Sequence, residues 1–174
     1  LHALGLDIIK IIIVGDSITH LTREIKDAYE QSALVIITGG LGPTDDDYTI
    51  HALQQIFSFS IVQHEKSLER MKNFFSSVNA PLNQRDYKMI EIPKDAAVIE
   101  NIQGLAPGFI YDKIIALPGV PREMKQMFQD TVIPYIKKNL DVTPIYEKKY
   151  TIVGLKESDT NNRLIESEIT QLPC

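Results

Sequence analysis

The chain has 174 residues, of which 44% are hydrophobic and 24% are charged, and its formal net charge is -5. This length and composition predict one globular domain with a core of its own. The negative charge argues against a general nucleic-acid surface, because phosphates are bound by clustered Lys and Arg. No apolar run reaches the roughly 18 residues of a membrane span, and the single Cys174 excludes an internal disulfide framework. We therefore expect a cytoplasmic protein that binds neither membrane nor nucleic acid.

The first residues have the pattern of a helix end. The chain starts at Leu1 rather than Met, and Leu-His-Ala-Leu is followed by Gly5, the residue type that most often caps a helix C-terminus. We therefore expect that structure upstream of Leu1 is missing.

Apolar, mostly β-branched runs alternate with helical patterns along the chain. The three clearest strand candidates are Asp7–Val14, Ala33–Thr38 and Ile114–Leu117. This alternation is typical of an α/β fold with a largely parallel sheet. Shorter strands are expected at Ala97–Glu100 and Pro107–Tyr111, joined by a turn at Gly104, and a last strand at Tyr146–Val153.

Helical spacing of apolar residues predicts the remaining elements. The expected helices are Leu21–Glu30, Asp47–Phe57, Glu65–Val78, one that opens at Pro121, and Ser158–Glu168. Proline is favoured in a first helical turn, whereas Pro134 is expected to kink or shorten its helix. From Asn83 to Lys94 the periodicity weakens, and Ile92-Pro93 predicts a loop after a short helix.

The segment Thr38–Thr49 says more than any other about which ligand the protein could bind. Its sequence is Thr-Gly-Gly-Leu-Gly-Pro-Thr-Asp-Asp-Asp-Tyr-Thr, directly after an apolar strand. Gly39, Gly40 and Gly42 lack Cβ atoms, so their amides can approach a ligand closely and adopt positive φ. Open amides beside carboxylates suit a phosphorylated ligand held together with a divalent cation. An ordinary turn is an equally good interpretation of the glycines alone.

Residues after these glycines add stiffness, a hydroxyl group and charge. Pro43 stiffens the loop and Thr44 adds the hydroxyl, while Asp45, Asp46 and Asp47 follow with no Lys or Arg in the same segment. Clustered carboxylates repel one another unless they are exposed or bind a cation. Asp45 also suits a helix N-cap, the commonest use of such an aspartate. Asp46 and Asp47 are therefore the stronger candidates for a cation site.

A second loop, Leu117–Met124, has the same placement between an apolar strand and a helix. It reads Leu-Pro-Gly-Val-Pro-Arg-Glu-Met, and ligands of open α/β sheets collect beyond the carboxyl ends of strands. We therefore expect the two loops to face one pocket, although Pro-Gly-x-Pro alone is an ordinary turn. Glu123 could bind a cation or a hydroxyl group, or it could only stabilise the first turn of the helix.

Other catalytic patterns are weak or absent in the sequence. Asp16 follows the first apolar run, but capping the next helix is a slightly better interpretation of it. The histidines His2, His20, His51 and His64 show no metal-ligand spacing. The chain has no Gly-x-Ser-x-Gly elbow, no Walker motif and no Gly-x-Gly-x-x-Gly fingerprint, so a Rossmann-type oxidoreductase is not expected.

The two loop motifs resemble a known family. Thr-Gly-Gly-Leu-Gly-Pro-Thr-x-Asp-Asp-x-Thr, followed later by Leu-Pro-Gly-x-Pro-x-Glu-Met, closely resembles the CinA branch of the molybdopterin-binding MoaB/MogA superfamily. Further matches cover almost the whole chain in order: Val14-Gly15-Asp16, Asn83, Ala106-Pro107-Gly108-Phe109 and Gly154-x-x-Glu157-Ser158.

The resemblance implies a three-layer α/β/α domain that binds phosphorylated pterin or nucleotide ligands. MogA-type members take part in molybdenum cofactor biosynthesis, with molybdopterin as ligand. CinA-type members are linked with Mg²⁺- or K⁺-assisted hydrolysis of ADP-ribose, and a related domain of some FAD synthases acts on FAD. The nicotinamide-nucleotide deamidase activity of CinA belongs to a separate C-terminal domain, for which this chain is too short. Family members are commonly dimers or trimers, so we expect a homo-oligomer.

Carried over by position, the resemblance assigns a role to each matching residue. The expected ligand-binding residues are Thr38, Gly39, Gly40, Gly42, Pro43, Thr44, Thr49, Gly119, Pro121 and Glu123. Asp46 and Asp47 are expected to bind the metal, and Asp16 and Asp47 to serve in catalysis. MogA-type proteins have an arginine where Asp46 stands, which weakens the inference to molybdopterin because a cation must replace the guanidinium.

The family normally begins with a strand followed by Gly-Thr-Glu and an Asn-Thr-Asn segment, and this chain enters after that region. The leading hypothesis is a single CinA-like domain over residues 1–174, without its N-terminal strand and helix, that binds a phosphorylated pterin or nucleotide. As an enzyme it would be a metal-dependent nucleotidyl transferase or nucleotide pyrophosphatase. The alternative is a non-catalytic ligand-binding or oligomerisation module of the same fold.

Overall fold

The computed structural model describes residues 1–143 and 151–166. The described residues separate into two compact units, one formed by Ile9–Asn139 and the other by residues 1–8 with those that follow Asn139. The larger unit contains the sheet and the two glycine loops.

A four-stranded sheet with the order β1-β6-β5-β4 organises the larger unit. Its strands are β1 (Val35–Thr38), β4 (Ala97–Ile99), β5 (Gly108–Tyr111) and β6 (Ile114–Leu117). β1 and β6 are parallel, with Val35 opposite Ile114 and Thr38 opposite Leu117. β5 runs antiparallel to both of its neighbours. A separate antiparallel pair is formed by β2 (Ile61–Gln63) and β3 (Glu91–Pro93).

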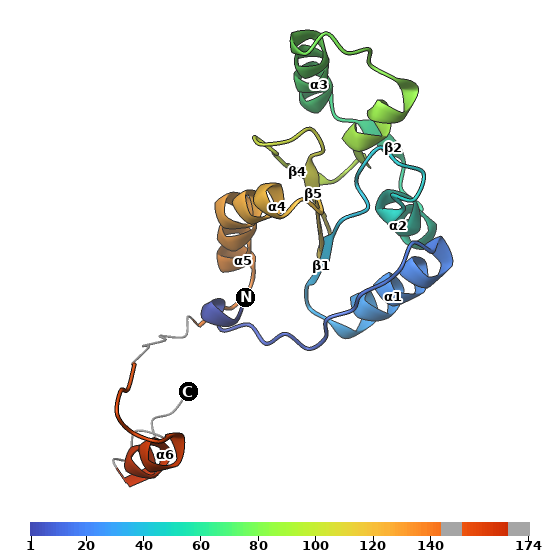
Figure 1. The fold of residues 1–174 in the computed structure, drawn as a ribbon. Coiled ribbons are helices and arrows are strands. Elements are labelled where there is room, and N and C mark those ends of the chain that lie inside the picture. The colour runs from blue at the N-terminus through green and yellow to red at the C-terminus, as the bar shows by residue number, and fades with distance from the viewer. Residues whose placement is uncertain (144–150, 167–174) are drawn as a thin grey trace. The chain divides into compact units, whose positions relative to one another are not determined.

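Helices cover both faces of the four-stranded sheet, which gives the larger unit three layers (Figure 1). On one face lie α1 (Ile18–Gln31) and α2 (Thr49–Phe57). On the other lie α4 (Pro121–Met127), a π-helical segment (Phe128–Val132) and α5 (Ile133–Asn139). α3 (Glu65–Ser77) and a 3₁₀ helix (Gln84–Ile90) accompany β2 and β3. The predicted α/β class with three layers is confirmed.

Apolar side chains from α1, α2, β1 and β6 meet in one buried cluster. Members from these elements include Ile25, Val35, Ile50, Leu53 and Ile114. β6 is buried at all four positions, as expected for a strand covered on both faces. Each such side chain contributes about 1.5–3 kcal/mol through its removal from water. The core therefore fixes β1 and β6 beside each other, and with them the loops that follow.

Most predicted helices are confirmed with shifted ends. α1 extends beyond the expected Leu21–Glu30 at both ends, and α2 begins at Thr49 rather than Asp47. The helix that opens at Pro121 continues to Asn139, because a π-helical turn precedes Pro134. Such a turn accommodates a residue that has no N–H to donate.

The sheet is mixed rather than largely parallel. β5 and β6 are joined only by Asp112 and Lys113, and a connection that short can join only antiparallel strands. Asp112 has a φ of 51°, a positive value that two-residue hairpin turns require. The expected loop at Ile92-Pro93 is also wrong, since both residues belong to β3, paired with the unforeseen strand β2.

The predicted strand Asp7–Val14 is wrong. This segment forms no regular element, and it pairs with no strand in the described part of the chain. Ile9, Ile11 and Ile13 are 74%, 79% and 96% exposed. Apolar sequence alone does not make a strand, because the backbone groups of a strand need a neighbour for their hydrogen bonds. β1 is correspondingly an edge strand among the described residues, with β6 as its sole partner.

The smaller unit contains a 3₁₀ helix (His2–Leu4) and α6 (Glu157–Glu166). Gly5 ends the first of these with a φ of 75°, which confirms the predicted glycine cap. The predicted helix Ser158–Glu168 is confirmed up to Glu166, and its last two residues lie outside the described residues. Residues 146–150 of the predicted strand Tyr146–Val153 also lie outside them, and residues 151–153 form no strand. None of the helices in the described ranges is long and apolar enough to cross a membrane.

Candidate functional site

The loops that follow β1 and β6 meet at the carboxyl ends of these two parallel strands. The N–H of Gly39 donates to the carbonyl of Leu117 at 2.9 Å. A Cβ atom on Gly119 would lie 3.2 Å from the Cα of Gly39, so the two loops approach each other through their backbones. The structure thus brings together the two loops that the sequence analysis paired.

Thr49 holds the glycine loop in shape from within the protein. Its side chain is buried, and its hydroxyl donates to the carbonyl of Gly39 at 2.8 Å. Its N–H donates to the carbonyl of Gly40 at 3.2 Å. Gly39 and Gly40 have φ values of 97° and 68°, which residues with a Cβ rarely adopt. A Cβ on Gly40 would also lie only 2.3 Å from the Thr49 hydroxyl oxygen.

Amides of the glycine loop remain open. Within the described residues, no protein acceptor is hydrogen-bonded to the amide of Gly40, Leu41 or Gly42. Amides without a protein acceptor beside positive-φ glycines are the kind of donors that anion-binding loops use, although Leu41 itself is buried.

The three aspartates after this loop have three different environments. Asp47 accepts hydrogen bonds from the amide and the hydroxyl of Thr44, at 2.9 and 2.6 Å, and it lies where a Cβ on Gly42 would clash. Hydrogen bonding to Thr44 and to its own amide, with the charge of Lys88 nearby, lowers the pKa of the exposed Asp46. Asp45 does not cap α2, because Tyr48 occupies the N-cap position. The N-cap interpretation of Asp45 is therefore wrong.

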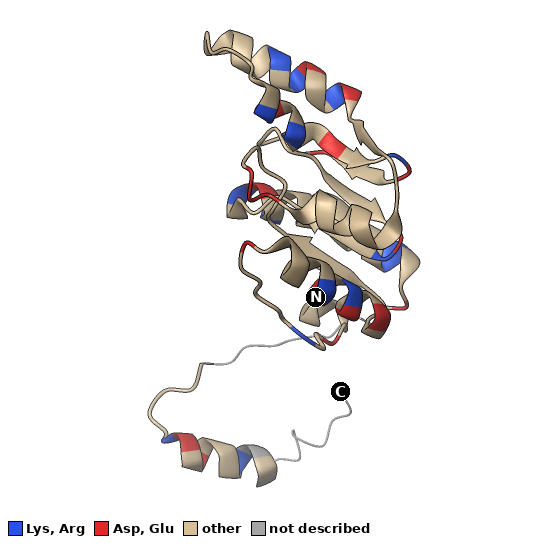
Figure 2. Cartoon of the chain, turned by 90° about the vertical axis from the view of Figure 1, so that its right-hand side faces the viewer, with Lys and Arg blue, Asp and Glu red and all other residues tan. Residues whose placement is uncertain are grey.

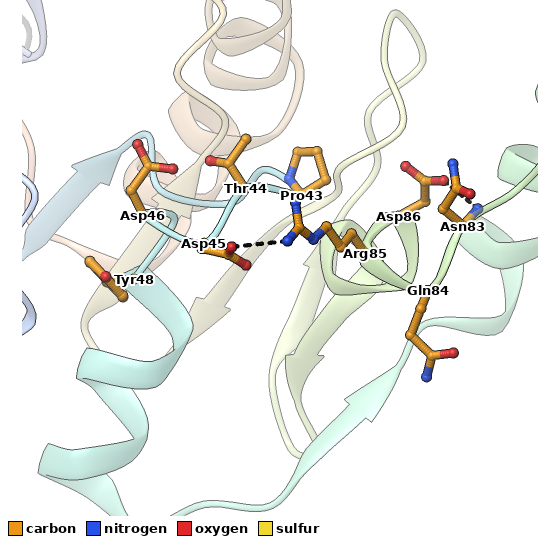
Figure 3. A pocket seen from close by; sticks show the side chains of 9 residues that line it. All are labelled: Pro43, Thr44, Asp45, Asp46, Tyr48, Asn83, Gln84, Arg85 and Asp86. Carbon is orange, nitrogen blue, oxygen red and sulfur yellow. Dashed lines mark hydrogen bonds and ion pairs between the residues drawn. The ribbon is translucent and has the colours of Figure 1, made fainter.

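A hollow of about 980 Å³ lies beside these aspartates (Figure 3). Two segments far apart in sequence line it. They contribute Pro43, Thr44, Asp45, Asp46 and Tyr48 from the glycine loop, and Asn83, Gln84, Arg85 and Asp86 from the start of the 3₁₀ helix. The second loop contributes no residue to this hollow. The predicted site residues that do not line it are Asp16, Thr38, Gly39, Gly40, Gly42, Asp47, Thr49, Gly119, Pro121 and Glu123.

Arg85 and Lys88 bring positive charge to the loop, which the sequence analysis missed. Arg85 forms an ion pair with Asp45, with 3.3 Å between the guanidinium nitrogen and the carboxylate oxygen. Lys88 donates to the carbonyl of Thr44. The glycine-loop segment itself contains no Lys or Arg, and these two cations come from a remote segment of the chain. Their spacing places both on one face of a 3₁₀ helix, but nothing in the local sequence indicates that this face lies beside the glycine loop.

A capping box fixes the segment that carries these cations. The side chain of Asn83 accepts from the backbone of Asp86, and the carboxylate of Asp86 accepts from the N–H of Asn83 at 2.7 Å. This reciprocal arrangement satisfies donors at the helix start. The 3₁₀ helix therefore presents Arg85 from a defined first turn.

Glu123 and Pro121 stabilise the second loop. Pro121 opens α4 at the first position, where its missing N–H has no cost. Glu123 accepts a hydrogen bond from the amide group of Asn101 at 2.6 Å. Asn101 is buried, and it also donates to Ala106 and accepts from the amide of Gly104. Glu123 thus anchors the loop before β5.

Asp16 is exposed at the start of α1 and does not cap it. The cap is Ser17, whose hydroxyl oxygen accepts from the N–H of His20 at 3.5 Å, so the capping interpretation of Asp16 is wrong. In the described part of the chain, no three His, Cys, Asp or Glu side chains converge in a way that could hold a metal ion.

The family model described as "Probable molybdopterin binding domain" matches residues 1–138. The chain belongs to this family. Its relatives include a protein named as competence-damage inducible in Clostridium botulinum strain 657, which is 39% identical over 160 residues. Another, named in the same way in Acetivibrio thermocellus, is 36% identical over 170 residues. These matches cover 90% and 95% of this chain but only 39% and 41% of the relatives.

One solved structure that is similar to this chain is that of the protein CinA, of unknown function, from Thermoplasma acidophilum. It is 32% identical, with a TM-score of 0.59 and coverage of 71% of this chain and 72% of that one. The relatives and this structure make the chain a CinA-like molybdopterin-binding domain, as the resemblance implied. The chain spans about two fifths of the length of the curated relatives it matches.

Proposed function

We propose that this CinA-like domain binds a phosphorylated pterin or nucleotide where its two glycine loops meet. The observation that carries the proposal is the backbone contact between Gly39 and Gly119 at the carboxyl ends of parallel β1 and β6. Ligands of open α/β sheets gather at this edge, and open loop amides suit a phosphate group. The adjoining hollow of about 980 Å³ is open to solvent and has room for a ligand of this size.

The donor set supports a cation shared between protein and ligand. Mg²⁺ is commonly held by one or two carboxylates together with substrate phosphates. Asp46 fits this role, because it lines the hollow and its side chain is exposed there. Asp47 already accepts two hydrogen bonds from Thr44, so it supports the loop and leaves Asp46 as the exposed ligand. A bound ion would supply Lewis-acid polarisation of a phosphoanhydride.

Metal-dependent hydrolysis of a nucleotide phosphoanhydride is the second candidate function. The position of Asp46 at the hollow favours it, because a cation there would lie next to phosphates bound by the loop. Asp16 takes no part in this proposal, since it neither lines the hollow nor belongs to either glycine loop. Binding without hydrolysis would instead support the alternative of a non-catalytic module.

Calorimetry and turnover on the full-length protein test both candidates. Molybdopterin, ADP-ribose and FAD are titrated with and without Mg²⁺, and product release is followed by chromatography. We expect at least one ligand to bind more tightly with Mg²⁺, and Asp46→Asn to abolish most of that gain. The matched control is Asp95→Asn, an exposed aspartate outside the hollow, which should behave as the wild type. The proposal fails if none of the three ligands binds or is turned over under any of these conditions.

A further inference from the structure

Arg85 extends from the 3₁₀ helix across the hollow toward the glycine loop (Figure 3). Its partner there is Asp45, and the two side chains are 74% and 81% exposed. Ion pairs that exposed contribute little stability, because water solvates both charges almost as well. Replacing one partner of this pair therefore costs the fold little.

The guanidinium of Arg85 has N–H groups that are not hydrogen-bonded to other described residues. It carries five N–H groups, its nearest nitrogen lies 3.3 Å from the Asp45 carboxylate, and the guanidinium donates no hydrogen bond within the described residues. The neighbouring carboxylate of Asp86 already accepts from the N–H of Asn83. Among the described residues, no hydrogen bond from Arg85 to a carbonyl fixes it in place, in contrast to Lys88, which donates to the carbonyl of Thr44.

We propose that Arg85 binds the phosphoanhydride of the ligand and that Asp45 occupies its guanidinium until the ligand arrives. This inference rests on the proposed function and deepens it, because it assigns the cation that receives the phosphates. A planar guanidinium can pair with two phosphate oxygens at once, whereas its closest approach to Asp45 is an exposed ion pair at 3.3 Å. A diphosphate therefore replaces the carboxylate, and Asp45 is a competitor of the ligand.

The inference predicts opposite effects on ligand binding for two aspartates that are neighbours in the sequence. Asp46 lines the hollow without a cation paired to it in the described structure, so its removal should weaken only metal-dependent binding. Asp45 opposes the ligand at Arg85, so its removal should strengthen binding with or without metal. A general repulsion by the acidic loop would instead make both neutral variants behave alike.

Calorimetry of the full-length protein without metal, with inorganic pyrophosphate and with ADP-ribose, tests this assignment. Arg85→Gln should weaken pyrophosphate binding by about tenfold, the size expected for a lost charge-assisted pair of hydrogen bonds. Asp45→Asn should strengthen it, and should have no effect in the Arg85→Gln background. The matched control is Arg23→Gln, an exposed arginine paired with Glu24 at 3.0 Å on α1, which should leave binding unchanged.

Each of the other possible results of this calorimetry contradicts one part of the proposal. If the wild type binds pyrophosphate and the Arg85→Gln and Arg23→Gln variants bind it with equal affinity, the role of Arg85 is overturned and the proposed function stands. Asp45→Asn weakening binding shows that Asp45 contacts the ligand and overturns the competition. Arg85-dependent binding of ADP-ribose without binding of pyrophosphate assigns the contact to another part of the ligand. A wild-type protein that binds neither probe, nor FAD or molybdopterin with Mg²⁺, overturns the proposed function itself.

Discussion

Thr49 shows how one side chain determines the conformation of the glycine loop. Its hydroxyl is the partner of the Gly39 carbonyl, and its position leaves no room for a Cβ at Gly40. The sequence analysis placed Thr49 among ligand-binding residues because it matches a family motif. Its burial gives it a structural role that the motif alone does not reveal.

We expect Thr49→Val to destabilise the protein and loosen the loop. Valine keeps the shape of threonine but leaves the Gly39 carbonyl without its donor in a part-buried hydrogen bond, which costs about 1 kcal/mol. Urea unfolding of the full-length protein measures the change. Thr22→Val is the control, because the Thr22 hydroxyl bonds to the exposed Gln55 side chain at 3.2 Å, and the free energy of unfolding should change by less than about 0.5 kcal/mol. Equal losses in the two variants would contradict the role of Thr49.

The residues missed by sequence reasoning share one physical property: their partners are far away along the chain. Asp45 and Arg85 are brought together by the packing of the 3₁₀ helix against the glycine loop. Local patterns predict which residues are charged or flexible, but they carry no information on which remote segment lies opposite. The glycines themselves were predictable, since positive φ is a local requirement.

At the scale of elements, an ion-pair network joins α3 to the end of β4. Glu100 accepts from Lys66 at 2.9 Å and from Arg70 at 2.6 Å. Both cations belong to α3, a helix on which basic and acidic residues alternate (Figure 2). Burial raises the pKa of Glu100, but the hydrogen bonds and charges of Lys66 and Arg70 outweigh it, so its pKa lies below the usual value. Glu100 is therefore more easily ionised in the folded protein than in the unfolded chain.

We expect Glu100→Gln to lower the free energy of unfolding near pH 7 by about 1 kcal/mol, the upper range for partly exposed pairs. Because the folded pKa is lowered, this stabilisation is present above the unfolded pKa of about 4.3 and is lost as the pH falls through the folded pKa. The difference between variant and wild type should therefore shrink below about pH 4. Urea unfolding at pH 7 and pH 3 measures it.

Glu69→Gln is the control for this prediction. Glu69 is exposed on the same helix and forms no ion pair among the described residues. A pH-independent loss for Glu100→Gln, or an equal loss for Glu69→Gln, would mean that the network does not stabilise the contact between α3 and β4.

At the scale of the whole molecule, hydrophobic patterning predicted the α/β class and the four strands of the main sheet but not how they pair, and the three layers were implied by the family resemblance. α1, α2 and α3 could be predicted because a helix satisfies its own backbone and buries a periodic stripe. Strand pairing depends on neighbours outside any local window, so Asp7–Val14 was expected as a strand and Ile92-Pro93 as a loop. Both predictions were wrong for this reason.

We expect the full-length protein to form a homo-oligomer, a dimer or a trimer, as the family resemblance implies. Exposed apolar side chains, among them Ile9, Ile11 and Ile13, favour association. Light scattering coupled to size-exclusion chromatography, at two protein concentrations, measures the mass. A mass of one chain at both concentrations would contradict the expectation.

The exposed stretch Ile8–Val14 also affects how this polypeptide behaves before it is folded. Seven residues of high β-propensity, without proline or glycine and with Lys10 as their sole charge, have the signature of segments that stack into cross-β aggregates. A single charge within such a run acts as a gatekeeper, because stacked copies would bring like charges together. Lys10 is therefore the residue within this run that opposes its aggregation during synthesis and refolding.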